Sequence, residues 1–403
     1  MHNNKIKKYI TLNSFIALLI YHFTVIRFYY FNYNFNFISL VILLSILLFY
    51  IFPKINKINN KSALILNCVL LIMSVFIILS SLVNTYNIDG SLLYVLRINI
   101  LMLFFELAVT HENIINICKM YAYFNILYLS VTYFYIKRYP LMAYKNMSNY
   151  FLGTKFYVSY LCLFTLALIY VVYNQLIISK FIYKIVYILL SLFVLKFVLL
   201  IKCTTGIVGL IVFLLFIVFQ CFLEKIIYKP RVIVAINVIC CVIVFVMNKL
   251  LQTEFVKNIV VDFLGKDLTL TGRTIVYTKI IDFIIDKPLL GYGYNRVYSL
   301  FKNVMKIGKN AYALDAQNAM LEFCLYFGII GVILINIYIY ILFSKLRKNK
   351  FMYGICSYIY VMCLLGIAEI TINMLLYISF AILYSLSNLK DIEKCNDKIV
   401  CKV

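Results

Sequence analysis

The residues best suited to chemistry gather in one stretch, residues 271–318, the longest part of the chain that is not almost entirely apolar. It opens with Arg273 and closes with Asp315. A guanidinium suits two-point contact with phosphate, and a helix start adds a favourable dipole for an anion. A carboxylate beside a dry pocket can gain basicity and accept a proton from a sugar hydroxyl. The pair predicts a site that binds an anion and activates a hydroxyl.

More polar residues follow Asp315 where the chain enters its next apolar run. Gln317 and Asn318 can bind sugar hydroxyls there or cap the helix, and their position alone favours the cap. Glu322 lies four residues after Asn318, shares its helix face and is a further candidate for substrate contact. Structural alternatives stay open as well, because Arg273 can face lipid headgroups and Asp315 can cap a helix or pair with a lysine.

A helix is expected between the two ends of this stretch. Thr271 is a suitable N-cap, and Pro288 ends the helix. Apolar residues follow helical spacing on one face and charged residues on the other, so the segment can lie on a membrane or cover a helical bundle. Gly291 and Gly293 then predict a tight turn whose backbone amides approach a ligand. Without a following glycine and helix, this pattern does not predict a dinucleotide site.

Composition identifies an all-α polytopic membrane protein. The 403 residues are 65% hydrophobic and only 13% charged, with a mean hydropathy of +0.98, far from the balance of a soluble domain. The formal net charge of +23 comes largely from lysines in short loops between apolar runs, where they set topology and meet anionic headgroups. Nucleic acid is therefore not an expected partner. We expect a single transmembrane domain, residues 1–403.

Runs of about 20 apolar residues mark helices that can cross the hydrocarbon core. The chain contains twelve such runs: residues 9–30, 35–52, 63–83, 92–110, 120–136, 156–176, 181–200, 205–222, 232–250, 319–343, 352–368 and 372–386. Lysine and arginine cluster in alternate loops, which places both termini in the cytoplasm and residues 251–318 in one long extracytoplasmic loop. No internal repeat is visible, which argues mildly against the inverted-repeat plan of many transporters.

Two outer loops break the charge rule. Residues 137–155, which end at Lys155, and the long loop, which holds Arg296, are both basic. Lys202 lies at a third outer edge. Such a face can bind a diphosphate or an acidic polymer, and it can equally face headgroups.

Charged residues inside the apolar runs are a separate set of functional candidates, because charges are costly at that depth. They are Arg97, Glu106, Lys196, Glu322 and Glu369. Arg97 and Glu106 are nine residues apart, on opposite helix faces, and are expected to have different partners. The twelve cysteines form no CxxC pair and the three histidines form no HxxxH, so no metal or other cofactor is expected.

The motifs of the long stretch resemble those of the O-antigen polymerase and ligase superfamily, which includes the Wzy-type polymerases. The first motif is a Gly-Arg start, an aromatic residue and Pro-Leu-x-Gly-x-Gly, here Gly272, Arg273, Tyr277, Pro288, Leu289, Gly291 and Gly293. The second leads into an apolar run and here reads Asp315, Gln317, Asn318, Leu321, Gly328 and Gly331. Residues 153–156 and 202–206 resemble the family's other outer-edge motifs.

The resemblance implies a metal-independent membrane glycosyltransferase with a GT-C-like helical fold, in the cytoplasmic membrane of a bacterium. Such enzymes move a glycan from an undecaprenyl-diphosphate donor to a sugar hydroxyl outside the membrane, in capsule, O-antigen or exopolysaccharide assembly. A flippase and a chain-length regulator are the implied protein partners. Arg273, Arg296, Lys155 or Lys202 would stabilise the leaving diphosphate.

One departure from the family pattern concerns the base. The usual histidine is Gln317 here, and glutamine does not act as a base at neutral pH. Asp315 or Glu322 takes that role, or positioning and leaving-group stabilisation suffice. The absent histidine favours a polymerase over a ligase. A lipid-linked oligosaccharide flippase or other transporter, and a non-catalytic assembly factor, are the alternatives from other classes.

Overall fold

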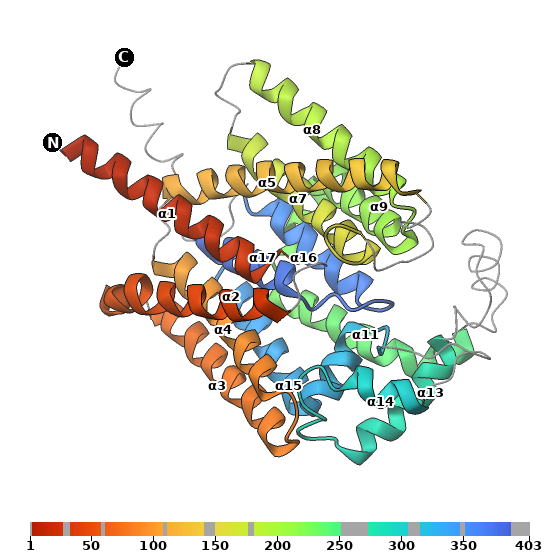
Figure 1. Ribbon diagram of the computed structural model, residues 1–403. Coiled ribbons are helices and arrows are strands. Elements are labelled where there is room, and N and C mark those ends of the chain that lie inside the picture. Colours follow the sequence, from red (N-terminus) through yellow and green to blue (C-terminus); the bar gives the residue numbers. More distant parts are fainter. Residues whose placement is uncertain are drawn as a thin grey trace.

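Helices supply the regular structure of this protein (Figure 1), seen in a computed structural model. The structure describes residues 2–26, 33–57, 61–107, 111–140, 150–175, 181–250, 273–304, 315–346 and 351–387. Within these ranges no strand forms, and the one β-type contact is an isolated bridge between Tyr150 and Gly153. The expectation of an all-α protein is therefore confirmed for the described part of the chain.

The helices follow the predicted apolar runs. The first half of the chain forms α1 (His2–Thr24), α2 (Tyr33–Ile46) with its continuations η1 (Leu47–Ile51) and η2 (Phe52–Lys57), α3 (Lys61–Val83), α4 (Ile88–Leu107), α5 (His111–Arg138) and α7 (Lys155–Gln175). The second half forms α8 (Phe181–Leu200), α9 (Thr204–Val218), α10 (Gln220–Ile227), α11 (Pro230–Leu250), α13 (Arg273–Asp286), α14 (Val297–Val304), α15 (Ala319–Ser344), α16 (Tyr353–Leu365) and α17 (Met374–Ser387). Each of the twelve runs overlaps at least one of these helices.

Not all of these helices are long enough to cross a membrane. By length and composition, six helices in the described residues can cross a membrane, or seven if the bent pair α9 and α10 counts as one. The predicted run 205–222 is not straight, because the chain turns by 99° between α9 and α10. The helices α16 and α17 have 13 and 14 residues, which cover only about 20 Å at 1.5 Å per residue.

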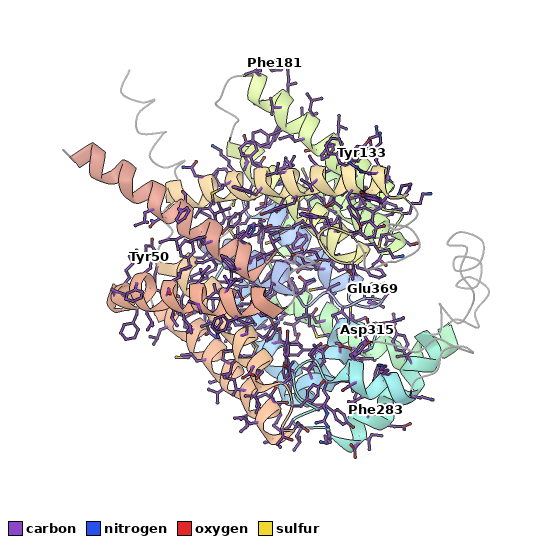
Figure 2. The ribbon with its side chains drawn as sticks, in the orientation of Figure 1. Tyr50, Tyr133, Phe181, Phe283, Asp315 and Glu369 are labelled. Carbon is purple, nitrogen blue, oxygen red and sulfur yellow. The ribbon has the colours of Figure 1, made fainter. Side chains whose placement is uncertain are left out.

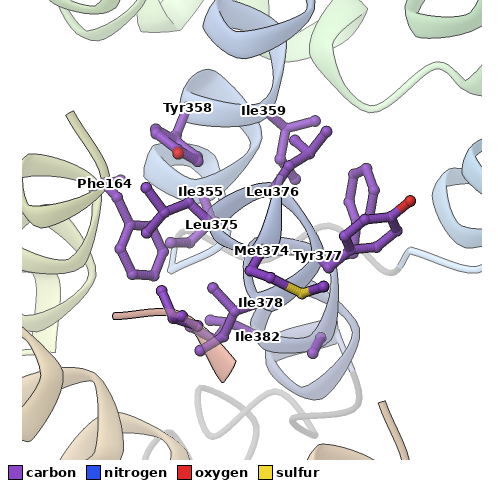
Figure 3. Close-up of a cluster of buried hydrophobic side chains, with 14 of the residues drawn as sticks. Phe164, Ile355, Tyr358, Ile359, Met374, Leu375, Leu376, Tyr377, Ile378 and Ile382 are labelled. Atoms are coloured by element: carbon purple, nitrogen blue, oxygen red, sulfur yellow. The ribbon is translucent and has the colours of Figure 1, made fainter. Parts of the chain in front are cut away.

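The two short helices lie in the interior instead of facing lipid. Every residue of α17 is buried, as are all but one of α16. Figure 3 shows Ile355 and Tyr358 of α16 packed beside Leu375 and Ile378 of α17, with Phe164 of α7 alongside. The apolar character of these helices therefore serves protein packing, and α8 at the periphery exposes its apolar side chains instead.

The long stretch packs on α15 through a break in that helix. Gly328 adopts φ 67° and ψ −174° inside α15, a region of backbone space that only glycine enters readily. A Cβ there would lie 2.0 Å from the carbonyl oxygen of Leu289. The turn at residues 288–293 enters this break: Ile329 N donates to Pro288 O, and Tyr292 N donates to Leu325 O at 2.8 Å. As predicted, α13 ends just before Pro288, at Asp286.

A second, smaller core forms beneath this turn. To this core α13 contributes Val276, Tyr277 and Ile280, and α14 contributes Val297 and Phe301. These side chains pack against buried residues of α15. Figure 1 shows α13 and α14 together at one edge of the molecule, beside α11 and α15. The apolar face predicted for residues 273–287 thus packs on protein.

Candidate functional site

A polar cavity of about 830 Å³ lies between α4 and α15. Along α4 it is lined by Gly90, Leu93, Tyr94 and Arg97, and along α15 by Ala319, Glu322, Phe323 and Tyr326. Both sets follow the spacing of three and four residues that places side chains on one helix face. We call these two faces the α4 wall and the α15 wall.

Helix ends from across the chain close the cavity. Thr24 at the end of α1, Asn36 near the start of α2 and Thr154 just before α7 all line it, as do residues of the turn between α16 and α17. The charge pattern predicts that these ends share the outer side of the membrane. Their convergence on one cavity agrees with that shared side.

Three carboxylates line the cavity: Glu322 on the α15 wall, Asp315 just before α15, and Glu369 in the turn after α16. Figure 2 labels Asp315 and Glu369. Glu322 is 3% exposed, and its Oε2 accepts a hydrogen bond from Ala316 N at 2.8 Å. The hydroxyl of Tyr326 hydrogen-bonds to the same carboxylate. Glu322 therefore fixes the turn that presents Asp315, whose Oδ1 in turn accepts from Gln317 N at 3.1 Å.

Asn318 has the capping role that its position favoured. Its Oδ1 accepts from Met320 N and Leu321 N, and its Nδ2 donates to Cys240 O and Ile367 O. The side chain is fully buried and does not line the cavity. These four hydrogen bonds use its amide to join α15, α11 and the turn after α16. A contact between Asn318 and substrate stays a prediction.

Gln317, which the resemblance predicts to stand in place of a histidine, has an unusual backbone conformation. Its φ is 49°, which is uncommon for a residue with a side chain and often marks a functional site. The Gln317 side chain does not line the cavity. Its carbonyl accepts a hydrogen bond from the hydroxyl of Tyr277 at 3.1 Å.

This contact joins the two predicted motifs. Tyr277 belongs to α13, which begins at Arg273, and Gln317 lies 40 residues further along the chain. Arg273 is one helical turn before Tyr277, so the start of α13 lies next to the segment from Asp315 to Asn318. The side chain of Arg273 and the proposed N-cap Thr271 lie outside the described residues. The anion-binding role of Arg273 thus stays a prediction.

The glycine turn binds protein instead of presenting free amides. Gly291 N donates to Lys287 O, and Gly293 N donates to Tyr326 O at 3.0 Å. Both amides thus already have acceptors on protein, at the end of α13 and in α15. A contact of this turn with a ligand stays a prediction. Burial and the Asp286 carboxylate raise the pKa of the Tyr292 phenol, so its hydroxyl stays protonated and donates to Asp286 at 2.8 Å. The turn at residues 288–293 therefore packs into the break in α15 and holds it.

The three basic candidates lie outside the cavity lining. Arg296 donates to Asn84 O at 2.9 Å and its guanidinium covers the ring of Tyr86, which ties the long stretch to the turn between α3 and α4. Lys155 begins α7 with its Nζ 5.3 Å from the centre of the Phe156 ring. Lys202 is exposed, with φ 54°. None of them lines the cavity, so a direct contact with substrate there is not supported by this geometry.

The cavity includes residues that the motifs did not identify. Tyr294 follows the glycine turn, stacks on Tyr94 with ring centres 4.7 Å apart and lies parallel to Phe327 at 6.4 Å. The turn therefore delivers an aromatic ring that bridges the two walls. The sequence feature that could have identified Tyr294 is its position directly after the Gly-x-Gly pattern. Aromatic faces with nearby amides and carboxylates are groups that bind sugars through stacking and hydroxyl hydrogen bonds.

Arg97 is the basic side chain among the lining residues that the structure describes. Its Nη2 donates to Ser39 Oγ at 3.2 Å and to Asn36 Oδ1 at 3.4 Å. Glu106 instead accepts from Asn67, so the expectation of different partners for the two charges is confirmed. In the described part of the chain, no group of three histidine, cysteine or acidic side chains is arranged to hold a metal ion.

The fold and cavity define a helical membrane protein with a polar, aromatic and acidic chamber among its helix ends. Residues 186–336 match the O-antigen ligase family. In this segment, a little over a third of the 403 residues, the chain is similar to that family. The match covers most of α8, the helices from α9 to α14 and most of α15, including Arg273, Asp315 and Glu322, but not α4. A search among curated proteins finds no match.

Proposed function

We propose that this protein is a membrane glycosyltransferase that polymerises undecaprenyl-diphosphate-linked oligosaccharide repeat units into an envelope polysaccharide such as capsule, O-antigen or exopolysaccharide. One observation carries the proposal: Asp315, from the family-matched segment, faces a chamber large enough for sugars and lined by tyrosines and asparagines. A glycan chain needs such stacking and hydroxyl contacts, and a transfer reaction needs a base beside them.

The chemistry follows from Asp315. Its carboxylate accepts the proton of an acceptor sugar hydroxyl, whose oxygen then bonds to the anomeric carbon of the donor glycan. The bond from that carbon to the diphosphate oxygen breaks, and the diphosphate leaves with the electron pair. Cationic side chains stabilise the charge that develops on the leaving group, and Arg273 is proposed for this role. Asp315 then returns its proton to water.

Glu322 is proposed as a positioning residue. Its carboxylate accepts the Ala316 amide and so holds the turn that carries Asp315. Gln317 lacks a basic group at neutral pH, and it holds α13 through its carbonyl. Because this position holds no histidine, Asp315, two residues earlier in the chain, is proposed as the base.

The setting of the reaction is proposed from topology. A single transmembrane domain, residues 1–403, lies in the cytoplasmic membrane of a bacterium with both termini in the cytoplasm. Its twelve apolar runs are proposed as the crossings, although only six or seven helices of the described residues have the length of a full span. Residues 251–318 form a long extracytoplasmic loop, so that the cavity opens toward the outer leaflet, where a flippase delivers lipid-linked units. A chain-length regulator is a further proposed partner, and a GT-C-like relationship is proposed for the fold.

Ligase-like transfer to a different acceptor is the second candidate, because the matched family is described as O-antigen ligase. The two reactions share a donor and differ in the acceptor. A polymerase extends a lipid-linked glycan, whereas a ligase moves a glycan to another molecule. Product analysis separates them: a ladder of repeat units on undecaprenyl diphosphate identifies the polymerase, and a single transfer to another carrier identifies the ligase.

The test replaces Arg273 by alanine in the intact chain within its native cells. We expect long polymer to disappear while single lipid-linked repeat units accumulate on the outer leaflet, because removing one charge-stabilising donor slows such reactions by about 100-fold or more. Gel analysis of the polysaccharide and mass spectrometry of extracted lipids measure both. Full-length chains in the Arg273→Ala strain would contradict the anion-binding role.

A further inference from the structure

An apolar groove lies between α8 and its neighbours α7 and α9. Figure 1 shows α8 at the edge of the molecule, and the groove has a volume of about 260 Å³. Three of the polar side chains in its lining already have partners in the protein. The hydroxyl of Tyr170 donates to Gln220 Oε1 at 2.6 Å, and Ser191 donates to the backbone of Tyr187. The hydroxyl of Tyr187 hydrogen-bonds to that of Tyr123.

The rest of the groove lining is mostly aliphatic. It includes two residues from each of the three helices: Leu166, Ile169, Ile188, Leu192, Leu214 and Ile217. Some of these side chains are exposed on α8 and α9, Leu192 at 55% and Ile188 at 50%, so the groove is open to its surroundings. An open apolar surface between membrane helices suits a hydrocarbon chain and offers little to a sugar.

The groove lies toward the opposite end of α7 from the polar cavity. Tyr157 near the start of α7 lines the cavity, and Tyr173 near its end lines the groove. At 1.5 Å per residue these two positions are about 24 Å apart along the helix, which is most of the thickness of the hydrocarbon core. On the proposed topology the cavity faces outward, so the groove belongs to the cytoplasmic half of the membrane.

A short helix marks the membrane surface next to the groove. The chain turns by 99° between α9 and α10, so where α9 runs across the membrane α10 runs along its surface. Gln220, the first residue of α10, accepts the hydroxyl of Tyr170 from the groove lining. On α10, Phe222 is 77% exposed and Lys225 is exposed. Exposed apolar and basic side chains on a helix that lies in the plane are typical of a membrane interface.

Basic side chains lie at the groove and on α10. Lys184 comes four residues before Ile188, so it shares the groove face of α8 one turn nearer the cytoplasm. Lys225 and Lys229 are exposed at the end of α10 and just after it. We call these three lysines the basic rim. The acidic residue of α10, Glu224, lies instead toward tyrosines of α7 and of the turn after α10.

We propose that the groove and the basic rim bind an anionic phospholipid of the cytoplasmic leaflet, with one acyl chain in the groove and the headgroup phosphate at Lys184. The basic rim supplies the charge complementarity that favours this lipid over a zwitterionic one. The separation from the cavity favours it over the polyprenyl carrier, whose diphosphate reacts on the outer side in the proposed function. The inference concerns a second ligand and does not depend on glycan transfer.

The experiment counts the lipids bound to the full chain by native mass spectrometry. The purified protein is equilibrated with phosphatidylglycerol and phosphatidylcholine of the same acyl chains, so that only the headgroup differs, and separately with undecaprenyl phosphate. Lys184→Gln removes the charge at the groove, and Lys184→Arg keeps it. Leu192→Trp places a larger side chain in the groove from an exposed position on α8.

Lys345→Gln is the matched control. Lys345 is an exposed lysine just after α15, on the same side of the membrane in the proposed topology, and it does not line the groove. General attraction of anionic lipid to the cytoplasmic surface would act on both lysines, whereas a built site acts on Lys184 alone. Thermal unfolding of each variant reports its folding.

We expect the parent protein to retain phosphatidylglycerol in preference to phosphatidylcholine. Lys184→Gln should weaken phosphatidylglycerol binding by about fivefold, since one basic residue near the surface strengthens attraction to an anionic lipid by about that factor. Lys184→Arg and Lys345→Gln should match the parent. Leu192→Trp should reduce the binding of both phospholipids, because the acyl chain loses its place.

Equal losses of phosphatidylglycerol in Lys184→Gln and Lys345→Gln would overturn the inference in favour of general surface attraction. A folded Leu192→Trp that keeps its phosphatidylglycerol would overturn it as well. Loss of undecaprenyl phosphate alone in that variant would assign the groove to the carrier and not to a phospholipid. If Leu192→Trp does not fold, the comparison of Lys184 with Lys345 decides. The proposed function stands in each case, because repeat-unit transfer is measured separately.

Discussion

The two walls of the cavity are built in different ways. The α4 wall is one stripe of an unbroken helix, and its charge comes from Arg97. The α15 wall belongs to a helix that is broken at Gly328, capped by Asn318 and wedged by the turn at residues 288–293. Its charge comes from Glu322, and Asp315 adds a second carboxylate just before the helix. Local helix periodicity positions the first wall, and main-chain contacts between distant segments position the second.

This difference assigns different tasks to the two walls. A bond-making site must hold its groups within a fraction of an ångström, and the cross-linked α15 wall has the anchors for that. A surface that only binds glycan needs a row of side chains on one helix face, which α4 supplies. The family match covers the α15 wall and none of the α4 wall. Chemistry is therefore expected to be more sensitive to changes in α15, and affinity for the glycan to changes in α4.

The largest expected effect is that of Asp315→Asn. Asparagine keeps the shape and still accepts a hydrogen bond from Gln317 N, but it cannot accept the proton of the acceptor hydroxyl. General base catalysis contributes about 100-fold or more, so polymer synthesis should fall by at least that factor while donor binding stays near the parent value. Repeat-unit transfer by the purified protein in nanodiscs measures the rate.

Gln317→Ala is the comparison for Asp315→Asn. Its side chain does not line the cavity, and the carbonyl that holds Tyr277 remains in alanine. We expect a milder loss, caused by alanine at a positive φ. The reverse ranking, with Gln317→Ala the more damaging change, would return catalysis to the family's histidine position.

A second and smaller effect distinguishes positioning from proton transfer at Glu322. Glu322→Ala leaves the buried Ala316 amide without its acceptor, a loss that costs about 1–3 kcal/mol, and should reduce turnover together with thermal stability. Glu322→Gln keeps an oxygen acceptor of the same size and should recover most of both. Turnover and unfolding temperature of the two variants give the readout. A Glu322→Gln protein that is folded and as inactive as Glu322→Ala would identify Glu322 as the base.

Much of what positions the α15 wall was predictable from sequence. The cap at Asn318 and the stop before Pro288 follow from local rules that act within a few residues. The partner of the Gly291–Gly293 turn did not follow, because a glycine pattern predicts a close approach without saying what approaches. Here the neighbour is the broken backbone at Gly328, 35 or more residues away in sequence.

The α4 wall was predictable only in part. Depth in an apolar run singled out Arg97 as a candidate, but nothing local indicates which helix it faces. Apolar runs are also ambiguous, because lipid and protein interior select the same residue types. The sequences of the buried helices α16 and α17 are therefore as apolar as that of the exposed α8, and they do not show which helix faces lipid. The bend between α9 and α10 has no proline that would predict it.

The smallest expected effect concerns Tyr294, whose ring joins the two walls. It stacks on Tyr94 of the α4 wall and lies parallel to Phe327 of α15, and aromatic pairs contribute about 0.5–1.5 kcal/mol each beyond burial. Tyr294→Phe keeps the ring and should unfold within a degree or two of the parent. Tyr294→Ala should lower the unfolding temperature in detergent by a few degrees, and it should weaken donor binding and turnover together, because both walls lose a shared support. If Tyr294→Ala reduced turnover alone, with stability and undecaprenyl diphosphate binding intact, the ring would act on the sugar and the walls would be positioned independently.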